Sequence, residues 1–84
     1  MNETDASERD VRLAIDREVE LVMSAVYLVA GGGAPSVTVA GLRLTEPVID
    51  IVQPIATQAG VVLEPLWAAD ESTCDVRVHR ADPT

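Results

Sequence analysis

The sequence predicts a small α/β domain in which two helices cover one face of a three-stranded mixed sheet, in the order α-β-α-β-β. Apolar residues recur at helical spacing through the first third of the chain, a second apolar segment has a helix start and end, and three short segments carry strand patterns. This two-layer sandwich is expected to span residues 8–80. Residues 1–7 are expected to form a disordered N-terminal tail and residues 81–84 a C-terminal tail.

The first helix is predicted over residues 8–30. Ser7 and Asp10 resemble a capping box at its start, and the glycines at 31–33 tolerate the left-handed backbone that ends many helices. A triple glycine is also typical of phosphate-binding loops, but those loops follow a strand and precede a helix, so the helix end is favoured. One apolar stripe follows the helix, made of Val11, Ile15, Val19, Val22, Val26 and Val29.

A second apolar row widens this stripe. Leu21, Ala25 and Leu28 lie on its flank, so the apolar arc exceeds what one packing partner covers. A chain of 84 residues buries only about 60–65% of its unfolded surface, and a single cysteine, Cys74, excludes an internal disulfide. Both observations favour a homodimer. The predicted interface consists of Leu21, Val22, Ala25, Val26, Leu28 and Val29.

A short strand and the start of a second helix come next. Residues 37–40, after Pro35, place Val37 and Val39 on one face of a strand, and residues 41–44 turn the chain. Thr45 is the expected N-cap of the helix, because a threonine hydroxyl can accept a hydrogen bond from a first-turn N–H group.

The body of this second helix contains a conflict at Pro54. Residues 48–52, VIDIV, fit either a helix or a strand that ends at Gln53, because an interior proline removes a helical hydrogen bond. A helix kinked at Pro54 and closed by Gly60 is favoured, since it supplies the crossover between two parallel strands.

The last two strands are predicted at residues 61–66 and 74–80, paired as an antiparallel hairpin. Pro65 cannot donate to a strand ladder, so the end of the first of these strands should lie near a sheet edge or a bulge. The inward residues are expected to be Val61, Leu63, Pro65, Trp67, Cys74, Val76 and Val78. The outer face is expected to carry Thr38, Glu64, Asp75, Arg77 and His79.

Charge narrows the classes of partner. The net charge of −8 disfavours a nucleic-acid binder, which needs clustered basic residues. It permits a basic protein partner. The first ten residues lack the pattern of a signal peptide, and the apolar run from Leu21 to Ala30 is too short to span a membrane, so a cytoplasmic protein without membrane contact is expected.

One candidate ligand site follows from the topology. In α/β proteins ligands bind where strands end and helices begin, and Gly41, Arg43, Thr45, Glu46 and Trp67 are expected at that end of the sheet. Free backbone N–H groups beside Arg43 would suit an anion such as a phosphate or a carboxylate. Against this site, Thr45 is fully explained as a helix cap, Arg43 as a solvated loop residue and Trp67 as the lid of a small core.

No set of residues predicts catalysis or a cofactor. Cys74 and His79 are an odd number of positions apart in one strand and should point to opposite faces. Asp75, Arg77 and His79 share a face at intervals of roughly 6.5–7 Å, too far for one to orient the next. Glu46 and Asp50 have no His or Cys nearby with which to hold a metal.

The sequence therefore predicts a non-enzymatic, homodimeric interaction or regulatory module. The alternative is a small-molecule or anion-binding sensory domain that uses the loop Gly41–Glu46, or an enzyme whose site forms only across a dimer.

Overall fold

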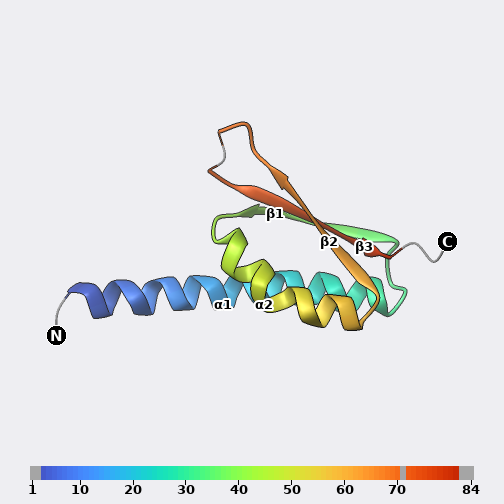
Figure 1. Cartoon of the computed structure of the whole chain (residues 1–84), viewed down its shortest axis with the longest axis horizontal. Helices are drawn as coiled ribbons and strands as arrows, with labels where there is room; N and C mark the ends of the chain where they lie inside the picture. Colours follow the sequence, from blue (N-terminus) through green and yellow to red (C-terminus); the bar gives the residue numbers. More distant parts are fainter. Residues whose placement is uncertain (1–2, 71, 82–84) are drawn as a thin grey trace.

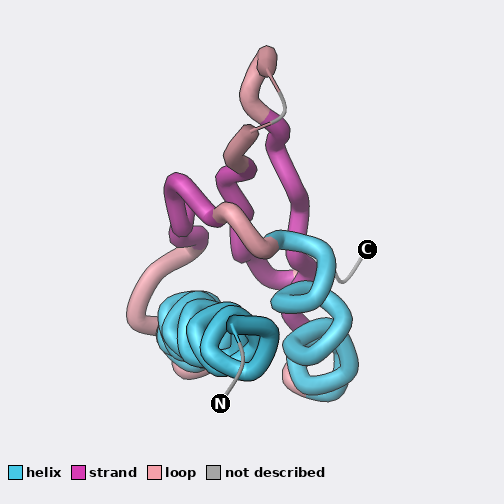
Figure 2. The backbone as a smooth tube through the Cα atoms, turned by 90° about the vertical axis from the view of Figure 1, so that its left-hand side faces the viewer, coloured by secondary structure: helices cyan, strands magenta, loops and turns pink. Residues whose placement is uncertain are grey.

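The computed structural model describes residues 3–70 and 72–81 and confirms the α/β class. Figure 1 shows a layer of two helices beneath a sheet of three strands. The elements are α1 (Glu3–Ala30), β1 (Ser36–Leu42), α2 (Thr45–Gln58), β2 (Val61–Trp67) and β3 (Cys74–Arg80). Figure 2 shows both helices side by side on the same side of the sheet, as predicted.

The sheet is antiparallel throughout, so the prediction of a mixed sheet is wrong. Its strand order is β1-β3-β2, and β3 pairs antiparallel with both neighbours. β1 and β2 do run in the same direction, as the crossover through α2 requires, but they are not adjacent. The crossover leaves a space one strand wide, and β3 enters it. The result is a split β-α-β unit.

Helix α1 begins at Glu3, five residues before its predicted start. Ser7 therefore lies within the helix and does not mark its beginning, and residues 3–7 are helical backbone rather than tail. Residues 1–2 and 82–84 of the two predicted tails lie outside the described residues.

The C-terminal end of α1 is the predicted glycine cap. The N–H of Gly33 donates to the carbonyl of Leu28 at 2.9 Å, and the N–H of Gly32 donates to that of Val29 at 3.1 Å. This pair of bonds is the Schellman arrangement, which needs a left-handed residue, and Gly32 has φ +82°. The triple glycine is thus explained as a helix end.

Helix α2 continues through Pro54, which settles the choice between helix and strand in favour of helix. Its predicted N-cap is wrong by one residue. Leu44 occupies the cap position and makes no side-chain cap bond, whereas Thr45 is the first helical residue and is buried. The helix ends at Gln58 with Ala59 as its C-cap, and the next residue, Gly60, has φ +73°.

Strand β1 is longer than predicted because the chain does not turn at Gly41. Val39 pairs with Val76 and Leu42 with Cys74, so β1 holds one more residue than β3 over this interval. The extra residue forms a bulge, and the φ of +74° at Gly41 lets the backbone bend there without strain.

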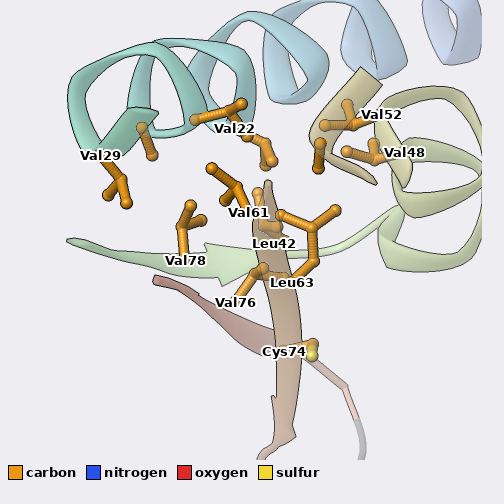
Figure 3. Packing of buried hydrophobic residues seen from close by; sticks show 13 residues of the cluster. Val22, Val29, Leu42, Val48, Val52, Val61, Leu63, Cys74, Val76 and Val78 are labelled. Atoms are coloured by element: carbon orange, nitrogen blue, oxygen red, sulfur yellow. The ribbon is translucent and has the colours of Figure 1, made fainter. Parts of the chain in front are cut away.

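The core lies between the two layers and is built largely from valine. α1 packs beneath β1 and β3, and α2 packs beneath β2. Side chains from all five elements point into this space in Figure 3. The fully buried residues with the largest side chains are Val22, Val26, Val29, Leu42, Val48, Val52, Cys74, Val76 and Val78. The N-terminal part of α1 extends past the sheet in Figure 1, which leaves Val11 exposed although it continues the buried stripe.

Candidate functional site

Three backbone N–H groups of the predicted anion loop, those of Gly41, Arg43 and Leu44, are already bound by carboxylates of the chain itself. The N–H groups of Arg43 and Leu44 donate to the two oxygens of Glu18 at 3.1 and 2.9 Å. The N–H of Gly41 donates to Oδ1 of Asp75 at 3.0 Å. Glu18 therefore occupies the position at the start of α2 where an external anion was expected, and it ties α1 to the junction between β1 and α2.

The five predicted ligand residues do not gather at one point. Thr45, Glu46 and Trp67 line a shallow cavity of about 330 Å³ between α2 and β2. Gly41 and Arg43 lie outside its lining, and both are exposed. The hydroxyl of Thr45 points back to the carbonyl of Leu42, at 3.5 Å.

The chemistry of this cavity also differs from the prediction. Its other lining residues are Ile49, Asp50 and Pro65, so its charged groups are two carboxylates one helical turn apart. Carboxylates repel an anion. The indole of Trp67, half exposed beside them, is a surface that suits an organic cation.

The predicted interface residues of α1 divide into two groups. Val22, Ala25, Val26 and Val29 are buried inside the single chain, so they are core residues and not surface residues. Leu21 and Leu28 remain about half exposed, at 51% and 48%. The apolar arc of α1 is wide because most of it packs into the core of the same chain, and Leu21 and Leu28 remain half exposed.

The outer face of the sheet is arranged as predicted. The pairing register places Thr38, Arg77 and Glu64 in one row across the three strands, and Ser36, His79 and Val62 in the next. Opposite this face, Cys74 is fully buried and donates through Sγ to the carbonyl of Asp75. Cys74 and His79 therefore lie on opposite faces and cannot act as a nucleophile and base.

The two sheet edges differ in sequence. β1, at one edge, has the sequence SVTVAGL and contains neither a charge nor a proline. β2, at the other edge, contains Glu64 and Pro65, and the cavity with Glu46 and Asp50 lies beside it.

Leu21 and Leu28 lie below the β1 edge. At one end of the contact, Glu18 of α1 binds the backbone of Arg43 just after β1. At the other end, Leu28 packs against Gly33 just before β1, so closely that a Cβ on Gly33 would collide with the Leu28 Cδ1. The helix flank between these two contacts follows β1 along its length. We call the outer edge of residues 36–42, together with Leu21 and Leu28, the β1–α1 side.

Two residues with clear structural roles were missed from sequence. Arg80 donates to the carbonyls of Val29 and Ala30 at 3.3 and 3.4 Å, and so binds the C-terminal end of α1. Its signal was weak, because a last-strand arginine has no fixed distance from a helix end. Glu18 had a better signal. It lies three residues after Ile15 and four before Val22, so it shares the buried face of α1 and needs donors there.

Titration and metal chemistry give no further site. The pKa of Asp70 lies below its usual range because the hydroxyl and then the N–H of Ser72 donate to its carboxylate, at 2.7 and 3.1 Å. These two hydrogen bonds belong to the turn between β2 and β3. Among the described side chains, those of residues 8–70 and 72–81, no three His, Cys, Asp or Glu groups gather as metal ligands. Nor does either helix, over its described length, combine the length and apolar character needed to cross a membrane.

Comparisons with protein-family models, curated proteins and solved structures found no match to this chain.

Proposed function

We propose that the protein is a non-enzymatic interaction module that works as a homodimer. The observation that carries this proposal is the amount of large apolar surface left uncovered on so small a chain. Among residues 8–70 and 72–81, ten such side chains are between 38 and 65% exposed: Val11, Leu13, Leu21, Tyr27, Leu28, Ile51, Ile55, Val62, Leu66 and Trp67. Single exposed apolar residues are ordinary, whereas contiguous ones mark contact surfaces.

Self-association supplies what the single chain lacks. In the described part of the chain the buried core consists of valine and small residues with two leucines, Leu42 and Leu63. Covering a half-exposed leucine in a dimer adds apolar burial at about 25 cal/mol per Å². An interface that covers Leu21 and Leu28 in both copies therefore extends a thin core across the subunit boundary.

The proposal leaves catalysis out on geometric grounds. The single cysteine is buried on the inner face and the single histidine lies on the outer face. The acidic surface, with a net charge of −8, supports a basic protein as a further partner and disfavours nucleic acid.

Small-molecule binding is the second candidate function, and the cavity at Trp67 is the observation that favours it. Because Glu46 and Asp50 line this cavity, the ligand class becomes an organic cation rather than an anion. A thermal-shift comparison of choline with inorganic phosphate tests this candidate. Choline should raise the melting temperature and Trp67→Ala should remove the shift, because only a ligand of the native state stabilises it. A shift with phosphate alone contradicts it.

Light scattering coupled to gel filtration tests the dimer. At micromolar concentration the mass should be twice that of the 8.9 kDa chain. Leu21→Glu should reduce it to one chain, because it places a charge in the proposed contact. Ile51→Glu is the matched control, since Ile51 is also helical and is 49% exposed against 51% for Leu21. A monomer mass for the unaltered protein would contradict self-association.

A further inference from the structure

The outer edge of β1 has main-chain groups without partners in the described part of the chain. Only the edge that faces β3 is paired, and β3 is paired on both sides. The bulge at Gly41 bends the last part of β1, so residues 36–39 form the regular part of the edge. Such an edge can pair with an added strand.

The regular part of this edge, residues 36–39, lacks the charged side chains and the proline by which proteins commonly prevent such pairing. Charged side chains and proline commonly protect exposed edges, and β2 has both in Glu64 and Pro65. Residues 36–39 read Ser-Val-Thr-Val, without charge and rich in β-branched residues that favour strands. β1 is thus the unprotected edge of a sheet whose other edge is protected.

Two half-exposed leucines of α1, Leu21 and Leu28, lie on the flank of the helix that is held beside β1. Glu18 at one end and Leu28 at the other hold α1 along the length of β1, and Leu21 and Leu28 are half exposed between and beside these contacts. A partner that extends the sheet at β1 would therefore also cover both leucines.

Charge selects the occupant. Two copies with a net charge of −8 each repel one another unless they meet where carboxylates are absent, and strand 36–42 has none. A basic partner would find no opposite charge on this strand. The edge also matches itself, because two antiparallel copies of one strand pair about a two-fold axis with the same surface on each side.

We propose that a second copy of this chain docks on the β1–α1 side, so that β1 pairs antiparallel with its own copy. This inference rests on the self-association proposed above and names its surface. The two sheets join into one of six strands in the order β2-β3-β1-β1-β3-β2. Leu21 and Leu28 of each α1 helix lie against the partner's helix layer beneath the joined strands.

The arrangement fixes two distances. Adjacent strands lie about 4.8 Å apart, so β2 and its copy, at the far edges, are separated by about 24 Å or more. Thr38 and its copy lie on adjacent strands and stay within about 20 Å for any register in which residues 36–39 of the two copies pair with one another. Both Thr38 and Val62 face outward and are exposed, so both positions accept a spin label.

Pulsed electron paramagnetic resonance on labelled Thr38→Cys and Val62→Cys, each in a Cys74→Ala background, tests the proposal. The label distance at position 38 should be the shorter, below about 20 Å, and the distance at 62 at least about 24 Å. A dimer in which 62 gives the shorter distance, or in which both are long, overturns this surface but leaves self-association standing. A monomer overturns both.

Hydrogen exchange on the unaltered protein covers the case in which removing Cys74 prevents folding. The amides of residues 36–39 that point away from β3 should exchange more slowly as the protein concentration rises into the dimer range. Amides on the outer edge of β2 should not change. Protection on β2 alone, or no change on β1 in a proven dimer, overturns the proposal.

Discussion

The two open edges of the sheet differ in how they are protected against pairing with a strand of another chain. β2 carries Glu64 and Pro65, and the carboxylates of Glu46 and Asp50 lie near its end. β1 carries no charged residue and no proline, and two half-exposed leucines lie beneath it. A strand edge that must stay free is charged or broken, so the difference identifies the edge at which a partner is acceptable.

The largest expected effect is unfolding of the whole chain, which would abolish both edges of the sheet. Val26→Asp should unfold the chain, because Val26 is fully buried beneath the sheet and an unpaired charge there costs several kcal/mol. Far-ultraviolet circular dichroism during a urea titration measures this. The neighbouring Tyr27→Asp, at a side chain that is 65% exposed, should leave the midpoint nearly unchanged. Equal effects of the two substitutions on the midpoint would contradict the assignment of Val26 to the core.

A smaller effect concerns the attachment of the β1 edge to its supporting helix. Glu18→Ala should lower the free energy of unfolding by about 1–2 kcal/mol, because the N–H groups of Arg43 and Leu44 lose their acceptors at the start of α2. Chemical denaturation measures the loss, and Glu20→Ala, on the exposed side of α1, is the control. If both variants lose the same stability, Glu18 has no special role.

The difference between the edges should itself appear in the dissociation constant. Thr38→Asp places like charges on paired strands and should weaken the dimer about tenfold or more, equivalent to about 1.4 kcal/mol. Val62→Asp puts the same charge on the outer face of β2 and should leave the constant unchanged. Analytical ultracentrifugation compares them. The reverse ranking would assign the interface to β2.

The smallest effect lies at the turn between β2 and β3. Ser72→Ala should raise the pKa of Asp70 toward its usual value, since the Ser72 hydroxyl is the main cause of the lowered pKa. A lowered carboxyl pKa stabilises the fold above the pKa of the unfolded chain and loses this effect as pH falls through the folded pKa. An NMR titration of the carboxyl carbon should give the same pKa in monomer and dimer. Ser72→Thr retains a hydroxyl and should keep the pKa low.

Local patterns identified every element but not the sheet order. All three strands and both helices followed from periodicity and from glycine positions, whereas the helical state around Pro54 was inferred from the crossover that a helix supplies between two strands. The strand order did not follow, because two strands joined by a crossover can be neighbours or can leave room for a third strand between them. The periodicity of β2 and β3 does not distinguish these two arrangements. A signal was present in two other residues. Pro65 in β2 and Gly41 in β1 both favour edge strands, and only β3 then suits the centre.

The ligand prediction failed at its donor groups for a different reason. A free N–H at a helix start was inferred from the loop alone, whereas Glu18 is distant in sequence and reaches that loop only in the folded chain. The interface prediction likewise could not separate Val22 and Val26 from Leu21. A helical wheel gives direction, but the sheet width that decides burial comes from tertiary packing.

The central place of β3 has a consequence for the order in which the chain can fold. β3 follows the other four elements along the chain, and it is the one strand that both β1 and β2 contact. During synthesis, α1 and α2 can become helical early, but no sheet can form until Cys74–Arg80 has left the ribosome. Pairing β1 with β3 closes a long loop, so this step should be slow relative to helix formation. Until it occurs, the nascent chain exposes the uncharged β1 segment on both sides and depends on rapid completion to avoid aggregation.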